Sequence, residues 1–288
     1  MSHSFEARSV TTKDDDASEV LQTVPTSRTD LTARVLPQMK LGDGNMPGSL
    51  AAPPPPLPAS ATPAARAAGR FRVEGNAIVT GGAGDLGFAA SRALLEHGLA
   101  GLVLFDTNAA EGAAKARTLQ AEFPHARVGF VRVDVTDAAA VDAAVADAAA
   151  TLGGGIDVLV AFAGVVACQH AAETTAEDWR RVLDVNTTGP QVAYNVSKAG
   201  VLALAKSLAA EWAAHGIRVN SVSPGYMDTV LNEGVGLDAA KNVWLSRNPM
   251  RRMGRPDELA GAVVLLASRA GSYINGADIL VDGGQTVF

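Results

Sequence analysis

The sequence predicts an α/β fold with a doubly wound parallel sheet. From residue 71 onward, short apolar runs alternate with longer alanine-rich amphipathic segments, which is typical of repeated strand-helix units. A glycine-rich turn stands between the first apolar run and the first helical segment. The chain has 288 residues, 48% of them hydrophobic, enough for one sizeable core. We therefore expect a single folded domain over residues 71–288.

Residues 1–70 differ from the rest of the chain. They show no sustained hydrophobic period and include AAPPPPLPASATPAARAAG, a composition that buries too little surface to fold. We expect a disordered Pro/Ala-rich head. A second interpretation, that Pro53 to Pro56 form a polyproline ligand for another domain, stays open.

The folded part divides into strands and helices in alternation. The predicted strands are Asn76–Thr80, Leu102–Phe105, Val128–Val133, Val158–Phe162, Arg218–Val222 and Asp278–Val281. The predicted helices are Phe88–Glu96, Ala109–Ala121, Ala138–Leu152, Ala176–Val185, Val196–Ala214 and Pro256–Leu266. Thr174 and Glu177 suit a capping box, and Gly216 suits a helix C-cap.

Composition restricts the partners and the compartment. A formal charge of -6 and the absence of a long apolar run argue against nucleic acid and a membrane span. The lone cysteine cannot form an internal disulfide, and the first thirty residues lack an apolar targeting block. These features favour a cytoplasmic protein, and we predict no metal site.

The segment AIVTGGAGDLGFAASRALL places its glycines where a strand passes into a helix. Gly81, Gly84 and Gly87 permit a tight turn whose amides, with the helix dipole, can receive a pyrophosphate. Asp106 ends the second predicted strand, about twenty residues past Gly87, where a carboxylate can bind the ribose 2′-hydroxyl of a dinucleotide. Because a carboxylate repels a 2′-phosphate, NAD is favoured, while a nearby cation would admit NADP.

Tyr194 and Lys198 lie four residues apart in AYNVSKAGVLALAKSL, so a helix presents both on one face. An ammonium beside a phenol stabilises the phenolate and lowers the tyrosine pKa toward neutrality. Such a pair suits proton exchange with the oxygen of an alcohol or ketone. By itself, the same spacing also fits an ordinary surface contact.

Six motifs together carry a family resemblance. TGGAGDLG, IDVLVAFAG, DVNTTG, YNVSK, NSVSPGYMDT and INGADILVDGG follow one another in this order. From about Arg72 to its end, the chain resembles the classical short-chain dehydrogenase/reductase family, which has a Rossmann fold. Its motif residues are most similar to those of the branch that interconverts sugars or polyols and their keto forms, such as sorbose and xylulose reductases or mannitol and arabinitol dehydrogenases.

The resemblance assigns roles to particular residues. It implies that Tyr194 is the acid/base, that Lys198 is its electrostatic partner and that Asn186 holds a proton-relay water. It implies an NAD or NADP cofactor and a small alcohol or ketone substrate. The residues implied in cofactor binding are Gly81, Gly84, Leu86, Gly87, Asp106, Asp134, Val135, Ala163, Gly164, Tyr194, Lys198, Pro224, Gly225 and Thr229.

The sequence departs from the family pattern in three places. Asp85 stands where the glycine motif commonly has glycine, and an acid there would weaken pyrophosphate binding. AFAG replaces the family's NNAG. Between Asn186 and Tyr194, the family has a helix, a strand and a loop with the catalytic serine, whereas only TTGPQVA stands here. One helix-strand unit is therefore missing.

The missing unit leads to structural and functional expectations. We expect the strands at 158–162 and 218–222 to pair directly in parallel, giving a six-stranded sheet. The family is usually homo-oligomeric, but its usual interface helix is absent here, so we expect instability or aggregation. The first functional hypothesis is an NAD(P)-dependent oxidoreductase of a small polyol or ketose. The alternatives are a dinucleotide-binding protein with little or no turnover, and an incomplete translation of a full-length enzyme.

Overall fold

The computed structural model describes residues 39–43, 49–164, 177, 191–230 and 237–287. Within these ranges, the side chains of residues 191–194 and 238–240 are not described. Contacts divide the chain into two units, Met1–Met39 and Lys40–Phe288, and every element below lies in the second. The predicted helix over 176–185 and its Thr174–Glu177 capping box cannot be judged, because all but residue 177 lies outside the described residues.

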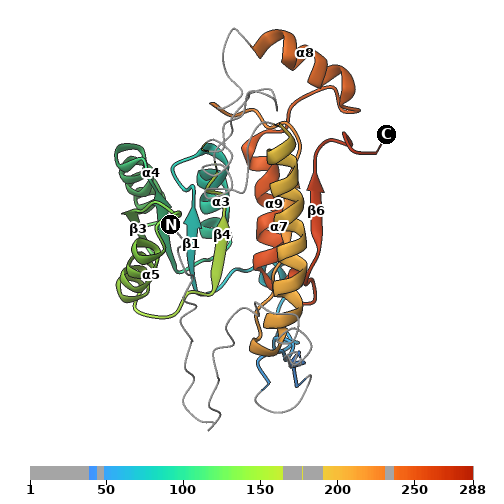
Figure 1. Cartoon of the computed structure of the whole chain (residues 1–288). Helices are drawn as coiled ribbons and strands as arrows, with labels where there is room; N and C mark the ends of the chain where they lie inside the picture. Colours follow the sequence, from blue (N-terminus) through green and yellow to red (C-terminus); the bar gives the residue numbers. More distant parts are fainter. Residues whose placement is uncertain (1–38, 44–48, 165–176, 178–190, 231–236, 288) are drawn as a thin grey trace, which may run out of the picture. The chain divides into compact units, whose positions relative to one another are not determined.

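The larger sheet has four parallel strands in the order β3-β2-β1-β4 (Figure 1). They are β1 (Asn76–Thr80), β2 (Gly101–Asp106), β3 (Arg127–Arg132) and β4 (Val158–Ala161). Thr80 at the end of β1 is in register with Phe105 on β2 and Ala161 on β4. The carboxyl ends of these strands therefore meet at one edge, the edge at which open α/β sheets bind ligands.

Helices cover both faces of this sheet. α3 (Asp85–Glu96), α4 (Ala109–Glu122) and α9 (Pro256–Ala267) contribute to one core with Val79 and Leu104, while α5 (Ala138–Leu152) packs with Ile78 and Val103 on the other face. Adjacent strand residues point to opposite faces, and the run AIV of β1 is buried throughout, so both faces of the sheet are covered. The predicted doubly wound arrangement is confirmed.

The expectation of one six-stranded sheet is wrong. β5 (Ser221–Pro224) and β6 (Asp278–Val281) form a separate two-stranded parallel sheet, and the ladders join β4 only to β1 and β5 only to β6 in the described part of the chain. α9 packs along α3 and also contacts β5 and β6. The sequence lacks the strand that the family has between Asn186 and Tyr194, so the ladder that would continue from β4 has no next strand, and β5 pairs with β6 beside α9.

The described chain between β4 and β6 carries further helices. α7 (Gln191–Trp212) runs into the short 3-10 helix η2 (Ala213–His215), and Gly216 ends it in the left-handed conformation predicted for a C-cap. α8 (Asp238–Arg247) precedes α9, and the 3-10 helix η5 (Arg269–Gly271) follows it. In the described parts of the chain, no helix combines the length and apolar character needed to cross a membrane.

The described part of the head contains a helix that was not predicted from the sequence. α2 (Pro63–Arg70) begins at Thr62, whose hydroxyl accepts a hydrogen bond from Ala65 N at 3.1 Å, and Pro63 occupies its first turn. This capped, alanine-containing start favours a helix despite the surrounding prolines. For these eight residues, the expectation of disorder is wrong.

Candidate functional site

The glycine turn between β1 and α3 has no room for side chains at its key positions. Gly81 has φ +67°, and a Cβ there would lie 2.8 Å from Ala163 N. A Cβ on Gly87 would lie 2.3 Å from Gly81 O. Gly84 is the N-cap of α3, so the helix N-terminus opens directly onto the turn. This bare backbone fits a dinucleotide pyrophosphate, which needs close approach and amide donors.

Two neighbouring strands hold this turn in place. The hydroxyl of Thr80 accepts a hydrogen bond from Ala163 N at 3.1 Å, which joins the turn to the predicted AFAG segment after β4. Asp106 at the end of β2 accepts a bond from Ala83 N at 3.0 Å through Oδ2. Its Oδ1 accepts from Asn108 N, also at 3.0 Å. The structure thus brings Gly81, Ala163 and Asp106 to one edge, as the sequence analysis expected.

Asp134 and Val135 follow β3 at the same sheet edge. The carboxylate of Asp134 accepts bonds from the backbone N and the hydroxyl of Thr136, at 3.0 and 2.8 Å. The backbone bond and then the hydroxyl bond hold the pKa of Asp134 below its usual value. Asp134 therefore shapes an exposed turn, and the N-cap of α5 is Asp137.

Pro224, Gly225 and Thr229 come from the smaller sheet. Pro224 ends β5, and Gly225 N donates to Val281 O at 3.0 Å. A Cβ on Gly225 would lie 2.8 Å from Asp282 Cα, so the β5 exit also requires glycine. Val230 N, directly after Thr229, donates to Asp85 Oδ2 at 3.0 Å. This bond brings the PGYMDT segment to the glycine turn although the two sheets are separate.

α7 places the backbones of Tyr194 and Lys198 on one helix, one turn apart. Burial lowers the pKa of Lys198 below its ordinary value of 10.5. Ser197 beside it is only 2% exposed. Asn186 and the side chain of Tyr194 lie outside the described residues, so the structure shows the helix, and the pairing of the two side chains stays a prediction.

A cavity of ≈ 240 Å³ lies beside the ends of β5 and β6, and none of the predicted site residues lines it. Met250, Tyr226 and Asp282 are among the residues that line it. Trp244 stacks on Tyr226 with ring centroids 4.2 Å apart.

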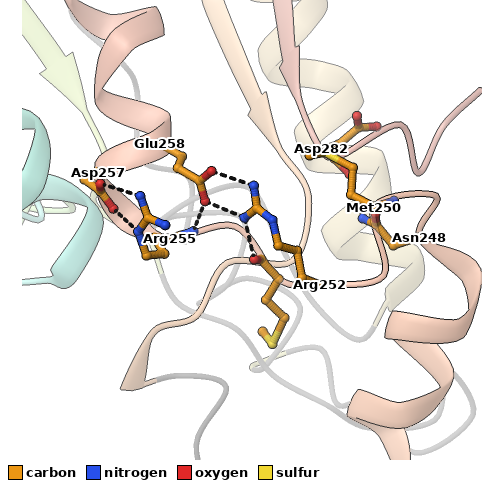
Figure 2. Close-up of polar contacts among 8 residues, drawn as sticks. Asn248, Met250, Arg252, Arg255, Asp257, Glu258 and Asp282 are labelled. Atoms are coloured by element: carbon orange, nitrogen blue, oxygen red, sulfur yellow. Dashed lines mark hydrogen bonds and ion pairs between the residues drawn. The ribbon is translucent and has the colours of Figure 1, made fainter.

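Charged side chains border this cavity. Figure 2 shows Arg252 in a double contact with Glu258, at 2.6 and 2.7 Å, and Arg255 paired with Asp257. Glu258 also accepts from Arg255 N at 2.8 Å, which fixes the start of α9. These ion pairs are structural features of the α9 N-terminus.

Lys115 on α4 is a site residue that sequence reasoning missed. Its ammonium donates to Ala83 O at 2.7 Å and lies 3.7 Å from Asp85 Oδ1. Lys115 is separated from the glycine motif by β2, so no local spacing links the two. The one available signal was Asp85, an acid whose position in an anion-binding turn calls for a compensating cation.

Comparison with known proteins identifies the family. Residues 75–192 match the family described as short chain dehydrogenase, and residues 188–286 match the family described as enoyl-(acyl carrier protein) reductase. A galactitol 2-dehydrogenase of Rhizobium johnstonii is 38% identical over 255 aligned positions, covering 75% of this chain and 97% of the relative. The chain belongs to the short-chain dehydrogenase/reductase family, whose members are oxidoreductases that use a nicotinamide dinucleotide.

Two further relatives bear on cofactor and fold. An NADP-dependent mannitol dehydrogenase of Alternaria alternata is 34% identical, covering 80% of this chain and 100% of the relative. The structure of a gluconate 5-dehydrogenase from Burkholderia cenocepacia, in complex with NADP and tartrate, matches with a TM-score of 0.70 at 32% identity. That match covers 77% of this chain and 99% of the other. The sugar and polyol branch suggested by the motifs is thus supported.

Proposed function

We propose that this chain is an NAD-preferring dehydrogenase/reductase that interconverts a small polyol and its ketose. The observation that carries the proposal is the hydrogen bond between Asp106 and Ala83 N, which sets a carboxylate against the glycine turn. A dinucleotide whose pyrophosphate lies on the turn would present its adenosine ribose to this acid. The bare glycines at positions 81 and 87 supply the space that the pyrophosphate needs.

The catalytic roles follow from the α7 pair. Bound nicotinamide supplies or accepts the hydride. Tyr194 donates a proton to the ketone oxygen during reduction and removes it from the alcohol during oxidation. The Lys198 ammonium favours the tyrosine phenolate electrostatically and can hydrogen-bond the cofactor ribose. Asn186 is proposed to hold the water that returns the proton to solvent.

The remaining cofactor residues are assigned by position. Pro224, Gly225 and Thr229 are proposed to frame the nicotinamide, which the bond from Val230 N to Asp85 supports by joining this segment to the turn. Ala163 and Gly164 are proposed to lie beside the cofactor ribose. Asp134 and Val135 are proposed to lie near the adenine.

The cofactor preference rests on charge. The Asp106 carboxylate repels a 2′-phosphate, whereas a free 2′-hydroxyl can donate to it. NADP use by the mannitol dehydrogenase and NADP binding in the gluconate dehydrogenase structure show that relatives accept the phosphorylated cofactor. The nearby cation, Lys115, donates its hydrogen bond to Ala83 O, on the side of Ala83 away from Asp106, so it does not offset the Asp106 charge. We therefore assign NAD as the preferred cofactor.

A second candidate is a dinucleotide-binding protein with little turnover. No residue inherits the family's catalytic serine, whose loss removes transition-state stabilisation of several kcal/mol. The galactitol 2-dehydrogenase alignment spans 255 positions although it covers only 75% of this 288-residue chain, so the relative has residues where this chain has none. The same difference supports an incomplete translation, which sequencing the transcript across Pro190 and Gln191 would test.

Turnover and binding measured together separate these candidates. NADH fluorescence would be titrated with the purified chain, and NADH consumption would be followed with a panel of ketoses. Tyr194→Phe should bind NADH like the wild type and lose turnover, while Tyr273→Phe, at a fully exposed tyrosine, should change neither. NADH binding without turnover in wild type would favour the second candidate. Absence of NADH binding would contradict both.

A further inference from the structure

An acid in the anion-binding turn requires a physical explanation. Asp85 is the first residue of α3, where the helix N-terminus faces the turn. Its Oδ2 accepts from Val230 N at 3.0 Å, and its Oδ1 lies 3.7 Å from Lys115 Nζ. The carboxylate is thus neutralised on one side and used as a backbone acceptor on the other.

Lys115 is well placed to act on the turn as well as on Asp85. Its side chain is only 15% exposed, and its ammonium lies 5.0 Å from the centre of the Phe88 ring. It donates to Ala83 O, while Ala83 N donates to Asp106. Side chains from α4 and β2 therefore hold both sides of one residue in the glycine turn. Glu111 also lies 3.5 Å from the ammonium, but its side chain is 52% exposed against 34% for Asp85. Water therefore screens the charge of Glu111 more strongly than the charge of Asp85.

We infer that Lys115 sets the affinity of the turn for an anionic dinucleotide by offsetting the charge of Asp85, an inference that rests on the proposed function. Two negative groups close together in a partly buried site repel each other, and a nearby ammonium offsets this repulsion. Asp85 in turn anchors the chain after Thr229 through Val230 N. By offsetting its charge, Lys115 allows Asp85 to hold Val230 N within a phosphate-binding turn.

A double-mutant cycle on the charges of Lys115 and Asp85 tests the inference directly. Lys115→Met removes the cation, Asp85→Asn removes the acid and keeps an oxygen acceptor for Val230 N, and the double variant removes both charges. We expect the NADH dissociation constant to rise on the order of tenfold in Lys115→Met, to fall in Asp85→Asn, and to return near wild type in the double variant. The Lys115→Met effect should shrink in high salt, because screening weakens charge repulsion.

Two further measurements separate charge from folding. Arg117→Met is the matched control, since Arg117 lies on the same helix, is exposed and faces away from the turn. It should leave NADH affinity unchanged. Thermal unfolding of each variant without nucleotide reports any loss of structure. A double variant that binds NADH as weakly as Lys115→Met would overturn the inference. A wild-type chain that binds no NADH would overturn the proposed function and the inference together.

Discussion

Asp106 joins cofactor choice to the shape of the glycine turn, because its carboxylate holds Ala83 N while its charge faces the expected ribose site. Asp106→Asn removes the charge and keeps one oxygen acceptor, which can serve either Ala83 N or Asn108 N. We predict that NADPH then binds on the order of tenfold more tightly, since the repulsion of its 2′-phosphate is gone. Fluorescence titration with NADH and NADPH measures this, with exposed Asp142→Asn as control. Unchanged NADPH binding would argue against the assigned role.

Lys198 gives stability a pH dependence of predictable sign. Burial lowers its folded-state pKa below 10.5, so between the two pKa values the unfolded chain binds more protons and stability rises with pH. The burial penalty is fully present below the folded pKa and is relieved as pH approaches 10.5. Relative to Lys198→Met, the wild type should gain melting temperature across this range. Lys206→Met, exposed on the same helix, should show no such trend.

Single residues also show how far the sequence predicts the site. Gly81, Gly87 and Asp106 were predictable because strand, turn and helix follow one another locally. Lys115 was not, because only packing of α4 beside the turn brings its ammonium to Ala83 O. The contact between Val230 N and Asp85 joins segments 145 residues apart, which no local pattern records.

At the scale of elements, the start of α9 depends on Glu258. The Arg252 side chain, and next the Arg255 backbone N–H, lower the pKa of Glu258 to about 2 from 4.5. Because the folded pKa is the lower one, this stabilisation is present above pH 4.5 and is lost as pH falls through about 2. Glu258→Gln should melt below wild type at neutral pH and converge with it in acid. Glu211→Gln, at an exposed glutamate, should track the wild type throughout.

Element boundaries were predictable where local chemistry marks them. α5 begins after the Asp137 N-cap and ends at Gly153 in the left-handed conformation, so its predicted range is confirmed. β5 begins at Ser221, three residues later than predicted. Upstream of it, Asn275 Oδ1 accepts from Val219 N, and Arg218 donates to three carbonyls near the end of α9 and η5. Long-range side-chain bonds there replace the strand ladder.

At the scale of the whole molecule, the separation of the two sheets leaves β4 at an edge, so β4 contributes less buried surface to stability than an inner strand. Leu159 on β4 is 67% exposed, whereas Leu104 on β2 is fully buried. We predict that Leu159→Ser changes the free energy of unfolding by less than about 0.5 kcal/mol, as exposed substitutions do. Leu104→Ser should cost about 2–5 kcal/mol. Urea denaturation measures both, and an equally large loss for Leu159→Ser would show that β4 is covered as in a continuous sheet.

That β4 and β5 lie in separate sheets was beyond sequence reasoning, because strand order depends on long-range packing. Local patterns located both strands, but not the packing of α9 against α3, β5 and β6. The unpaired edges and exposed Leu159 and Leu280 also favour self-association of the purified chain. Size-exclusion chromatography should show aggregates or a broad distribution, and a sharp tetramer peak of normal stability would contradict this expectation.

The most direct test of the account is a calorimetric titration of the wild-type chain with NADH and NADPH. We predict saturable binding of NADH at one site per chain and weaker binding of NADPH. Heats of dilution alone for both nucleotides would contradict the claim that the glycine turn and Asp106 form a dinucleotide site.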